Sequence, residues 1–135
     1  MIEEIYDFLD DLAAKNGIIV YWLSIPEYIP HRSNPHTKKI AMVGRHGRQD
    51  LIFPYAHEIS HVIFGDPTID KLYPYSPGAH SSSEMNADAH GLDMLIDWFD
   101  KYQDNGIVYS QRYAFMEWFK IPSHLERVVE RKLAN

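Results

Sequence analysis

The sequence contains no cysteine among its 135 residues. Zinc sites built on thiolates and catalysis by a cysteine nucleophile are therefore excluded. Any metal site in this chain must use histidine and carboxylate ligands. The absence of cysteine also fits a reducing compartment, where disulfides are rare.

Long hydrophobic runs are missing as well. The longest apolar stretch, residues 17–23, is far shorter than the roughly 20 residues that span a bilayer as a helix. The first residues are acidic, whereas a secretory signal begins with basic ones. We therefore expect a cytoplasmic protein with no membrane partner.

Basic residues are fewer than acidic ones: the chain has 13 lysines and arginines and 19 aspartates and glutamates, which gives a net charge of −6. A nucleic-acid surface needs clustered basic side chains that displace counterions from phosphates. Direct nucleic-acid binding is therefore not expected. The one dense basic cluster, Arg45 to Arg48, predicts a solvated hairpin turn, with a substrate contact as the alternative.

The length and the 45% hydrophobic content predict one compact domain over residues 1–135. Within it we expect a core over 1–103 and a C-terminal helical segment over 104–135, divided at Asp104-Asn-Gly106. Glu117, Glu126 and Glu130 accompany the basic residues of that segment, so we interpret its helices as structural and not as a DNA-binding motif.

Hydrophobic periodicity and the placement of proline and glycine predict an α+β fold. In it, helices pack against a short antiparallel or mixed sheet. Strands are expected at 18–22, 38–43 and 48–53, and a loop at 26–35. Helices are expected at 2–14, 54–64, from 81 onward, at 110–119 and at 123–133.

The helix expected at 54–64 contains the pattern His57-Glu58-Ile59-Ser60-His61. Residues four apart lie on one face of a helix, so both imidazoles can reach one Zn²⁺ at about 2.0–2.1 Å. Glu58 then lies beside the metal, where it can accept a proton from water. A half-buried, hydrogen-bonded histidine pair without a metal is the alternative.

The expected third ligand is Glu84, at the start of the second long helix. Asp88 lies four residues further along the same flank, where it can accept a hydrogen bond from a ligand histidine and fix its tautomer. Gly91 on that flank allows the two helices to approach closely. The alternative for Glu84 is a capping box with Ser81. The competing ligands are Asp88, His80, His90 and Asp93.

The run Phe53-x-x-Ala56-His57-Glu58-x-x-His61, followed by Glu84-x-x-Ala87-Asp88 and the pair Leu95-Ile96, resembles the ImmA/IrrE metallopeptidase family of bacteria, phages and mobile elements. The resemblance covers about residues 1–100. The chain departs from the family pattern at Ser60, at His90-Gly91 and at Asp97-Trp98. None of these positions is an expected ligand.

This resemblance implies a small zincin-like domain with a gluzincin-type site. His57, His61 and Glu84 would hold Zn²⁺, and Glu58 would be the catalytic carboxylate of an endopeptidase. It also implies a protein substrate, commonly a helix-turn-helix transcriptional repressor. Two other classes remain open: a regulator-binding module with a structural zinc site, and a metal-free helical interaction module.

Two further expectations concern substrate. The loop between Gly65 and His80 carries Tyr73, Tyr75 and His80, any of which could donate a hydrogen bond to an oxyanion. A strand that leads into the helix expected at 54–64 should offer an open edge for an extended peptide. This edge is expected either at 39–43 or at 48–53.

Overall fold

The computed structural model describes residues 1–65 and 77–134, with the backbone alone for residues 77–81. These ranges contain five α-helices, three strands and three short 3-10 helices. In chain order the elements are α1 (Ile2–Lys15), β1 (Ile19–Leu23), β2 (Arg32–Asn34), β3 (Lys39–Val43), η1 (Gln49–Leu51), α2 (Ile52–Phe64), α4 (Pro77–Tyr102), η2 (Tyr109–Gln111), α5 (Arg112–Phe119), η3 (Ser123–Leu125) and α6 (Glu126–Leu133). The expected α+β class is confirmed.

The three strands form a mixed sheet in the order β1-β3-β2. β1 runs parallel to β3, with Val20 opposite Ile40, and β2 runs antiparallel to β3, with Ser33 opposite Ile40. Ile40 and Met42 of the central strand are almost fully buried. Because residues opposite each other share a face of the sheet, Ser33 lies on this inner face too.

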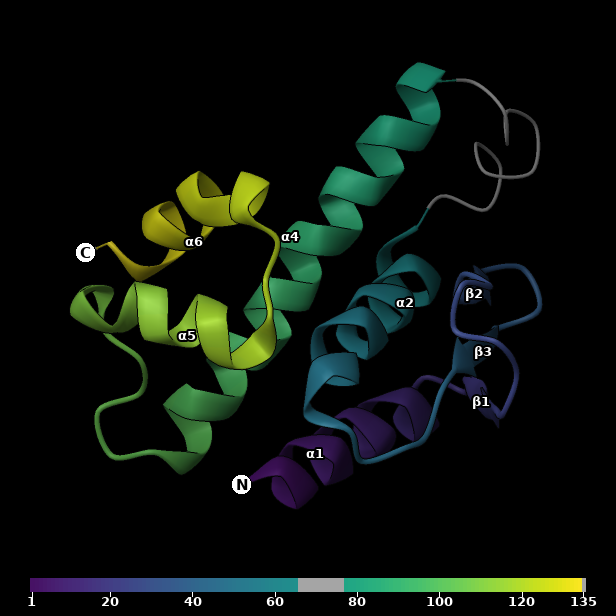
Figure 1. The fold of residues 1–135 in the computed structure, drawn as a ribbon, viewed down its shortest axis with the longest axis horizontal. Helices are drawn as coiled ribbons and strands as arrows, with labels where there is room; N and C mark the ends of the chain where they lie inside the picture. The colour runs from purple at the N-terminus through teal and green to yellow at the C-terminus, as the bar shows by residue number, and fades with distance from the viewer. Residues whose placement is uncertain (66–76, 135) are drawn as a thin grey trace.

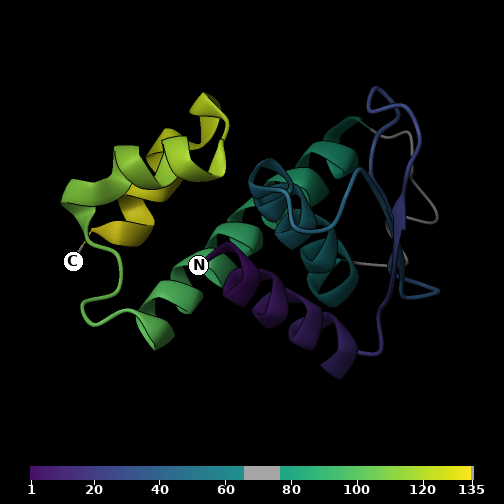
Figure 2. The ribbon, with the colours of Figure 1, turned by 60° about the horizontal axis from the view of Figure 1, so that its bottom comes forward.

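The elements stack in layers (Figures 1 and 2). The sheet lies at one side of the molecule, with α1 and α2 packed against it. α4 crosses α2 on the side away from the sheet, and α5 and α6 lie beyond α4. One hydrophobic core runs through the described residues, from Ile5 in α1 to Leu133 in α6. The division of the chain at residues 103 and 104 stays a prediction.

The predicted third strand at 48–53 is wrong. Residues 49–51 form η1, and α2 begins at Ile52. The Arg48 guanidinium donates two hydrogen bonds to the Asp50 carboxylate, at 3.0 and 2.6 Å, which closes a tight turn. α2 is buried on nearly every side, so the apolar residues at its start show no helical period. The sequence therefore did not distinguish them from the end of a strand.

The true third strand is β2, inside the stretch 26–35 that was predicted as loop. It has only three residues, and they are polar, so it lacks the β-branched and aromatic residues that mark most strands. Its pairing with β3 defines it, and a long-range pairing leaves no local signal in the sequence.

The predicted open edge at 39–43 is also wrong. These residues form β3, which is hydrogen-bonded on both sides. Met42 is 0% exposed, so this strand lies in the core and cannot receive a substrate along its edge. Within the described residues, the edges of the sheet belong to β1 and β2.

The long helix α4 begins at Pro77, four residues before the predicted start at Ser81. Proline suits the first turn of a helix, where its missing N–H costs no intrahelical bond. Ser81 therefore lies inside the helix and is not its N-cap. None of the helices in the described ranges is both long and apolar enough to cross a membrane.

The two predicted C-terminal helices are present, but each begins with a 3-10 turn. Ser110 and Ser123 lie within these turns, and the side chain of neither caps the α-helix that follows. The segment joins the rest of the molecule through polar contacts as well as the core. The Gln49 side-chain amide donates to the Trp118 carbonyl at 2.7 Å, and Lys132 pairs with Asp93 at 2.7 Å.

Candidate metal centre

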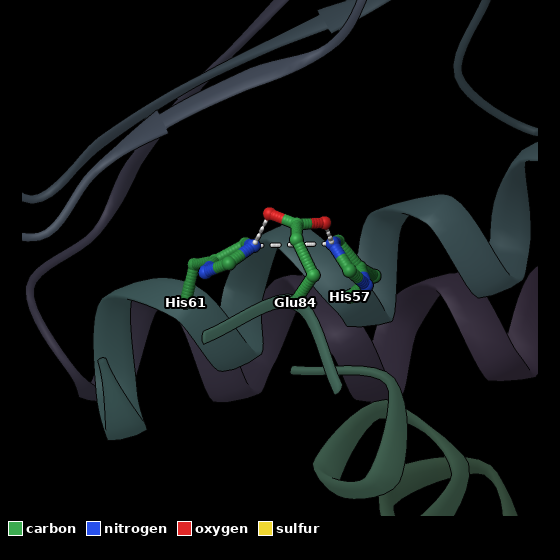
Figure 3. Close-up of side chains that lie close together, drawn as sticks. All are labelled: His57, His61 and Glu84. Atoms are coloured by element: carbon green, nitrogen blue, oxygen red, sulfur yellow. Dashed lines mark hydrogen bonds and ion pairs between the residues drawn. The ribbon is translucent and has the colours of Figure 1, made fainter. Parts of the chain in front are cut away.

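His57 and His61 lie one turn apart on the same face of α2, and both rings point toward Glu84 (Figure 3). Their Nε2 atoms are 3.1 Å apart. Each ring is at most 14% exposed at its side chain, so water competes little for these nitrogens. The structure therefore brings together the two histidines that the sequence pattern pairs.

Glu84 reaches this pair from α4 (Figure 3). One carboxylate oxygen lies 2.9 Å from His57 Nε2 and the other 2.8 Å from His61 Nε2. The capping box with Ser81 is thus the wrong interpretation of Glu84, because its carboxylate bridges two imidazoles of another helix. Among the described side chains, His57, His61 and Glu84 are the group whose ligand atoms all lie within 4.8 Å of one another.

The other ligands considered from the sequence have different partners. Asp88 contacts the outer nitrogen of His57, with Oδ1 at 2.7 Å from Nδ1. The His90 ring stacks on Phe64 at a centroid distance of 3.8 Å. Asp93 forms an ion pair with Lys132. The side chain of His80 lies outside the described part of the chain, as do Tyr73 and Tyr75, so the predicted oxyanion role of these three stays a prediction.

Asp88 holds the orientation of His57. When its carboxylate accepts a hydrogen bond from Nδ1–H, the second nitrogen, Nε2, faces Glu84 and His61. A carboxylate behind a histidine is the usual device that fixes the tautomer of a metal ligand. Asp88 stands three residues before Gly91, on the flank of α4 that faces α2.

Gly91 explains why the two helices come this close. A Cβ at this position would lie 3.3 Å from the backbone nitrogen of His57 and 3.4 Å from the backbone carbon of Ala56. Such distances are tighter than ordinary contacts, and both partners are main-chain atoms. The missing side chain therefore permits the approach that carries Glu84 and Asp88 to His57.

Glu58 is buried beside the histidines, with 8% of its surface exposed and one oxygen 3.7 Å from His57 Nε2. Burial raises the pKa of its carboxyl, although the charges of His57 and His61 and the nearby Ser33 side chain oppose this effect. A carboxylate with raised pKa, next to a cluster of metal-ligand type, is suited to accept a proton.

The charges of the cluster are strongly coupled. Burial lowers the pKa of the His57 imidazole, but hydrogen bonds to Asp88 and Glu84 more than compensate and raise it from 6.5 to about 10. Hydrogen bonds from His57 and His61 hold the pKa of the Glu84 carboxyl well below its usual range. Without a metal, the cluster is therefore held together by a proton on His57.

A metal ion would have to displace this proton, because histidine binds metals through a neutral nitrogen. Below pH 10 we therefore expect zinc affinity to rise with pH by up to about tenfold per unit. Competition with a zinc-responsive dye at pH 6, 7 and 8 measures the slope. Asp88→Asn removes the interaction that raises the pKa of His57 most, so the zinc affinity of this variant should depend less on pH. An affinity independent of pH would contradict this charge assignment.

The donor set fits a divalent zinc ion. Four ligands at about 2.0–2.1 Å in a tetrahedron are separated by about 3.3 Å. The observed separations are 2.8–3.1 Å, so the cluster must open by only a few tenths of an ångström. Two imidazole nitrogens and one carboxylate oxygen form the ligand set of a catalytic zinc site, which leaves a fourth position for water or substrate.

Two residues near the cluster were missed from the sequence, Ser33 and His31. The Ser33 side chain lies close enough to Glu58 to lower the pKa of its carboxyl. His31 Nδ1 accepts a hydrogen bond from the Val43 N–H at 2.8 Å, so the proton of the neutral ring is on Nε2. Burial and then the charge of His57 lower the pKa of His31. Both residues lie in or next to β2, and no local pattern marked that strand.

Comparisons of the chain with protein-family models, with curated proteins and with solved structures find no match.

Proposed function

We propose that this protein is a zinc-dependent hydrolase whose metal is held by His57, His61 and Glu84. Within that class we propose a zincin-like endopeptidase of the ImmA/IrrE type, acting on a protein in the cytoplasm. The observation that carries the proposal is the convergence of these three ligand atoms from two helices, with the buried Glu58 beside them. A cluster needed only for packing would gain nothing from a buried carboxylate, Glu58, next to the half-exposed carboxylate of Glu84.

Each polar residue of the cluster has a role in this proposal. Bound zinc would lower the pKa of its water toward neutrality and polarise the scissile carbonyl. Glu58 takes the proton from the attacking water and then delivers it to the leaving amine. Ser33 orients the Glu58 carboxylate through its hydroxyl. Asp88 keeps His57 in the required orientation.

The position of β2 supports a peptide as substrate. Ser33, in the middle of this strand, lies near Glu58, and β2 packs against α2, the helix that carries Glu58. Within the described residues, β2 pairs on one side only, with β3. An extended peptide that adds to the free side would be held by main-chain hydrogen bonds next to Glu58. A helix-turn-helix repressor is the substrate that the family resemblance suggests.

The test is Glu58→Gln, which keeps the size of the side chain and removes its basicity. We expect proteolysis to fall by about 10²–10⁴-fold, the usual contribution of a general base. Zinc content should stay that of the parent, because Glu58 is not a ligand. The assay incubates the zinc-loaded protein with a peptide library prepared from a bacterial proteome and identifies new peptide termini by mass spectrometry.

Glu117→Gln is the matched control, since Glu117 is exposed on α5. It should cleave the same peptides as the parent. Equal cleavage by Glu58→Gln and the parent would contradict the proposed mechanism. If neither the parent nor Glu58→Gln cleaves any peptide but both hold zinc, the metal is structural and a regulator-binding module becomes the better hypothesis.

A further inference from the structure

An open groove of about 1680 Å³ lies between α1 and the C-terminal half of α4, apart from the metal centre. It reaches α2 only at Ile63 and Phe64, and none of the three metal-ligand residues lines it. Figure 2 shows α1 and α4 diverging from near the N-terminus of the chain, so that each helix presents one side to the space between them.

The lining residues form one stripe on each helix. On α1 they include Glu4, Phe8 and Asp11, and on α4 they include Asp97 and Lys101. Spacings of three and four residues place side chains on one face of a helix, so one stripe from each helix faces the groove. A third helix laid between them would meet both stripes along its length.

The floor of the groove is apolar and partly open to solvent. At its base Trp98 and Met94 are only 3% and 6% exposed and Phe8 is half-buried, whereas Tyr102 and Phe64 at its ends are 61% and 52% exposed. Exposed aromatic side chains grouped around one groove are characteristic of surfaces that bind another protein.

The walls of the groove are acidic. Six carboxylate side chains line it, against three positive groups: Lys15, Lys101 and the N-terminal ammonium of Met1, which pairs with Glu4 at 2.8 Å. Lys15 pairs with Asp11 at 3.4 Å within α1, and the Lys101 ammonium of α4 reaches across the groove to lie 5.4 Å from the centre of the Phe8 ring of α1. Asp7 and Asp97 are exposed, one on each wall.

The molecule already contains a contact of the kind that such a partner would make. Lys132 of α6 reaches Asp93 on α4, and their charged atoms are 2.7 Å apart. Asp93 belongs to the lining of the groove. A basic residue on a short helix thus rests against the edge of the acidic stripe, within the same chain.

We propose that the α1–α4 groove binds a basic amphipathic α-helix of a protein partner. An α-helix is about 10–12 Å wide and rises about 5.4 Å per turn, so the groove has the volume of roughly three to four turns. The apolar face of the partner helix contacts Phe8 and the exposed rings of Tyr102 and Phe64, while its flanking lysines and arginines meet Asp7 and Asp97. This binding requires neither the metal nor hydrolysis.

Other occupants fit the groove less well. Small-molecule sites are enclosed and occupy about 300–1,000 Å³, whereas this groove is larger and open. Nucleic acid is repelled by acidic walls. A second copy of the chain would bring two acidic surfaces together, because the whole chain carries a net charge of −6.

The probe is a fluorescein-labelled 16-residue peptide with leucines at helical spacing and lysines and arginines on both flanks. Fluorescence anisotropy measures its binding to the full chain without added metal. Two control peptides are used, one with the basic residues replaced by glutamate and one with the same composition in scrambled order. We expect the basic helix to bind at least tenfold more tightly than either control.

The deciding variant is the double substitution Asp7→Lys with Asp97→Lys, which reverses one charge on each wall. It should weaken binding of the basic helix at least tenfold. The matched control, Glu117→Lys with Glu126→Lys, changes the net charge equally on α5 and α6, outside the groove, and should alter binding less than twofold. Circular dichroism melting confirms that both variants fold.

Equal weakening by both double variants would show non-specific charge attraction and overturn the proposal. Equal binding of the scrambled peptide would overturn it as well, because the groove would not be selecting a helix. Sedimentation velocity addresses a second copy of the chain: a dimer that dissociates only when Asp7 and Asp97 are changed would assign the groove to self-association instead.

Discussion

Replacing either His57 or His61 with alanine is expected to abolish stoichiometric zinc binding. Each residue supplies one of three ligand atoms, and the two ligands that remain cannot hold the ion against water. The fold should survive in both variants, because the two rings lie at the edge of the core and not within its apolar cluster. Metal content measured by mass spectrometry after gel filtration, on protein prepared without a histidine tag, gives the result.

The same measurement separates the roles of the two carboxylates. Glu84→Gln should weaken zinc binding more than Asp88→Asn, for which we expect a loss of about 10–100-fold, because Asp88 contacts a ligand and not the metal position. His36→Ala, at an exposed histidine in the turn before β3, should bind zinc like the parent. Full affinity in Glu84→Gln together with metal loss in Asp88→Asn would reverse the two assignments.

The helices of the centre were predictable because their signals are local. His57 and His61 share a helical face through their spacing alone, Gly65 marks the end of the segment, and Pro54 lies in its first turn, two residues after the start at Ile52. The start of α4 was placed four residues too late, at Ser81, because the capping pattern there has the same residues as a real helix start. Only the tertiary contact with His57 and His61 shows what Glu84 binds.

The sheet was less predictable because its order depends on long-range pairing. β1 and β3 were recognised by their apolar residues, but nothing local shows that β3 lies in the middle. β2 has no apolar residue, so the strand nearest to Glu58 was taken as loop. The misplacement of the free edge at β3 and the omission of Ser33 therefore share one cause.

This difference between local and long-range information also applies to Gly91. The sequence places it on the flank of α4 that carries Glu84 and Asp88, but only the structure shows the 3.3 Å approach of its missing Cβ to the backbone of His57. Backbone atoms of α2 cannot rotate aside as a side chain could. A larger residue here must push the two helices apart.

Gly91→Val is therefore expected to lower the stability of the metal-free protein and to weaken zinc binding in the same variant. Overpacking of a tight helix contact costs about 1–3 kcal/mol. Glu84 and Asp88 move with α4, while His57 stays on α2, so a small separation lengthens the 2.7 and 2.9 Å contacts that hold the centre. Thermal unfolding of the metal-free protein and zinc competition with a chelating dye measure the two effects.

Gly91→Ala decides whether packing or helix propensity dominates at this position. Propensity alone would make alanine more stable than glycine by about 1 kcal/mol, because glycine loses more backbone freedom in a helix. A methyl group 3.3–3.4 Å from three backbone atoms opposes that gain. We expect the packing cost to win, so that Gly91→Ala is less stable than the parent and Gly91→Val less stable still. A more stable alanine variant with unchanged zinc affinity would show that α2 and α4 have room to spare at the metal centre.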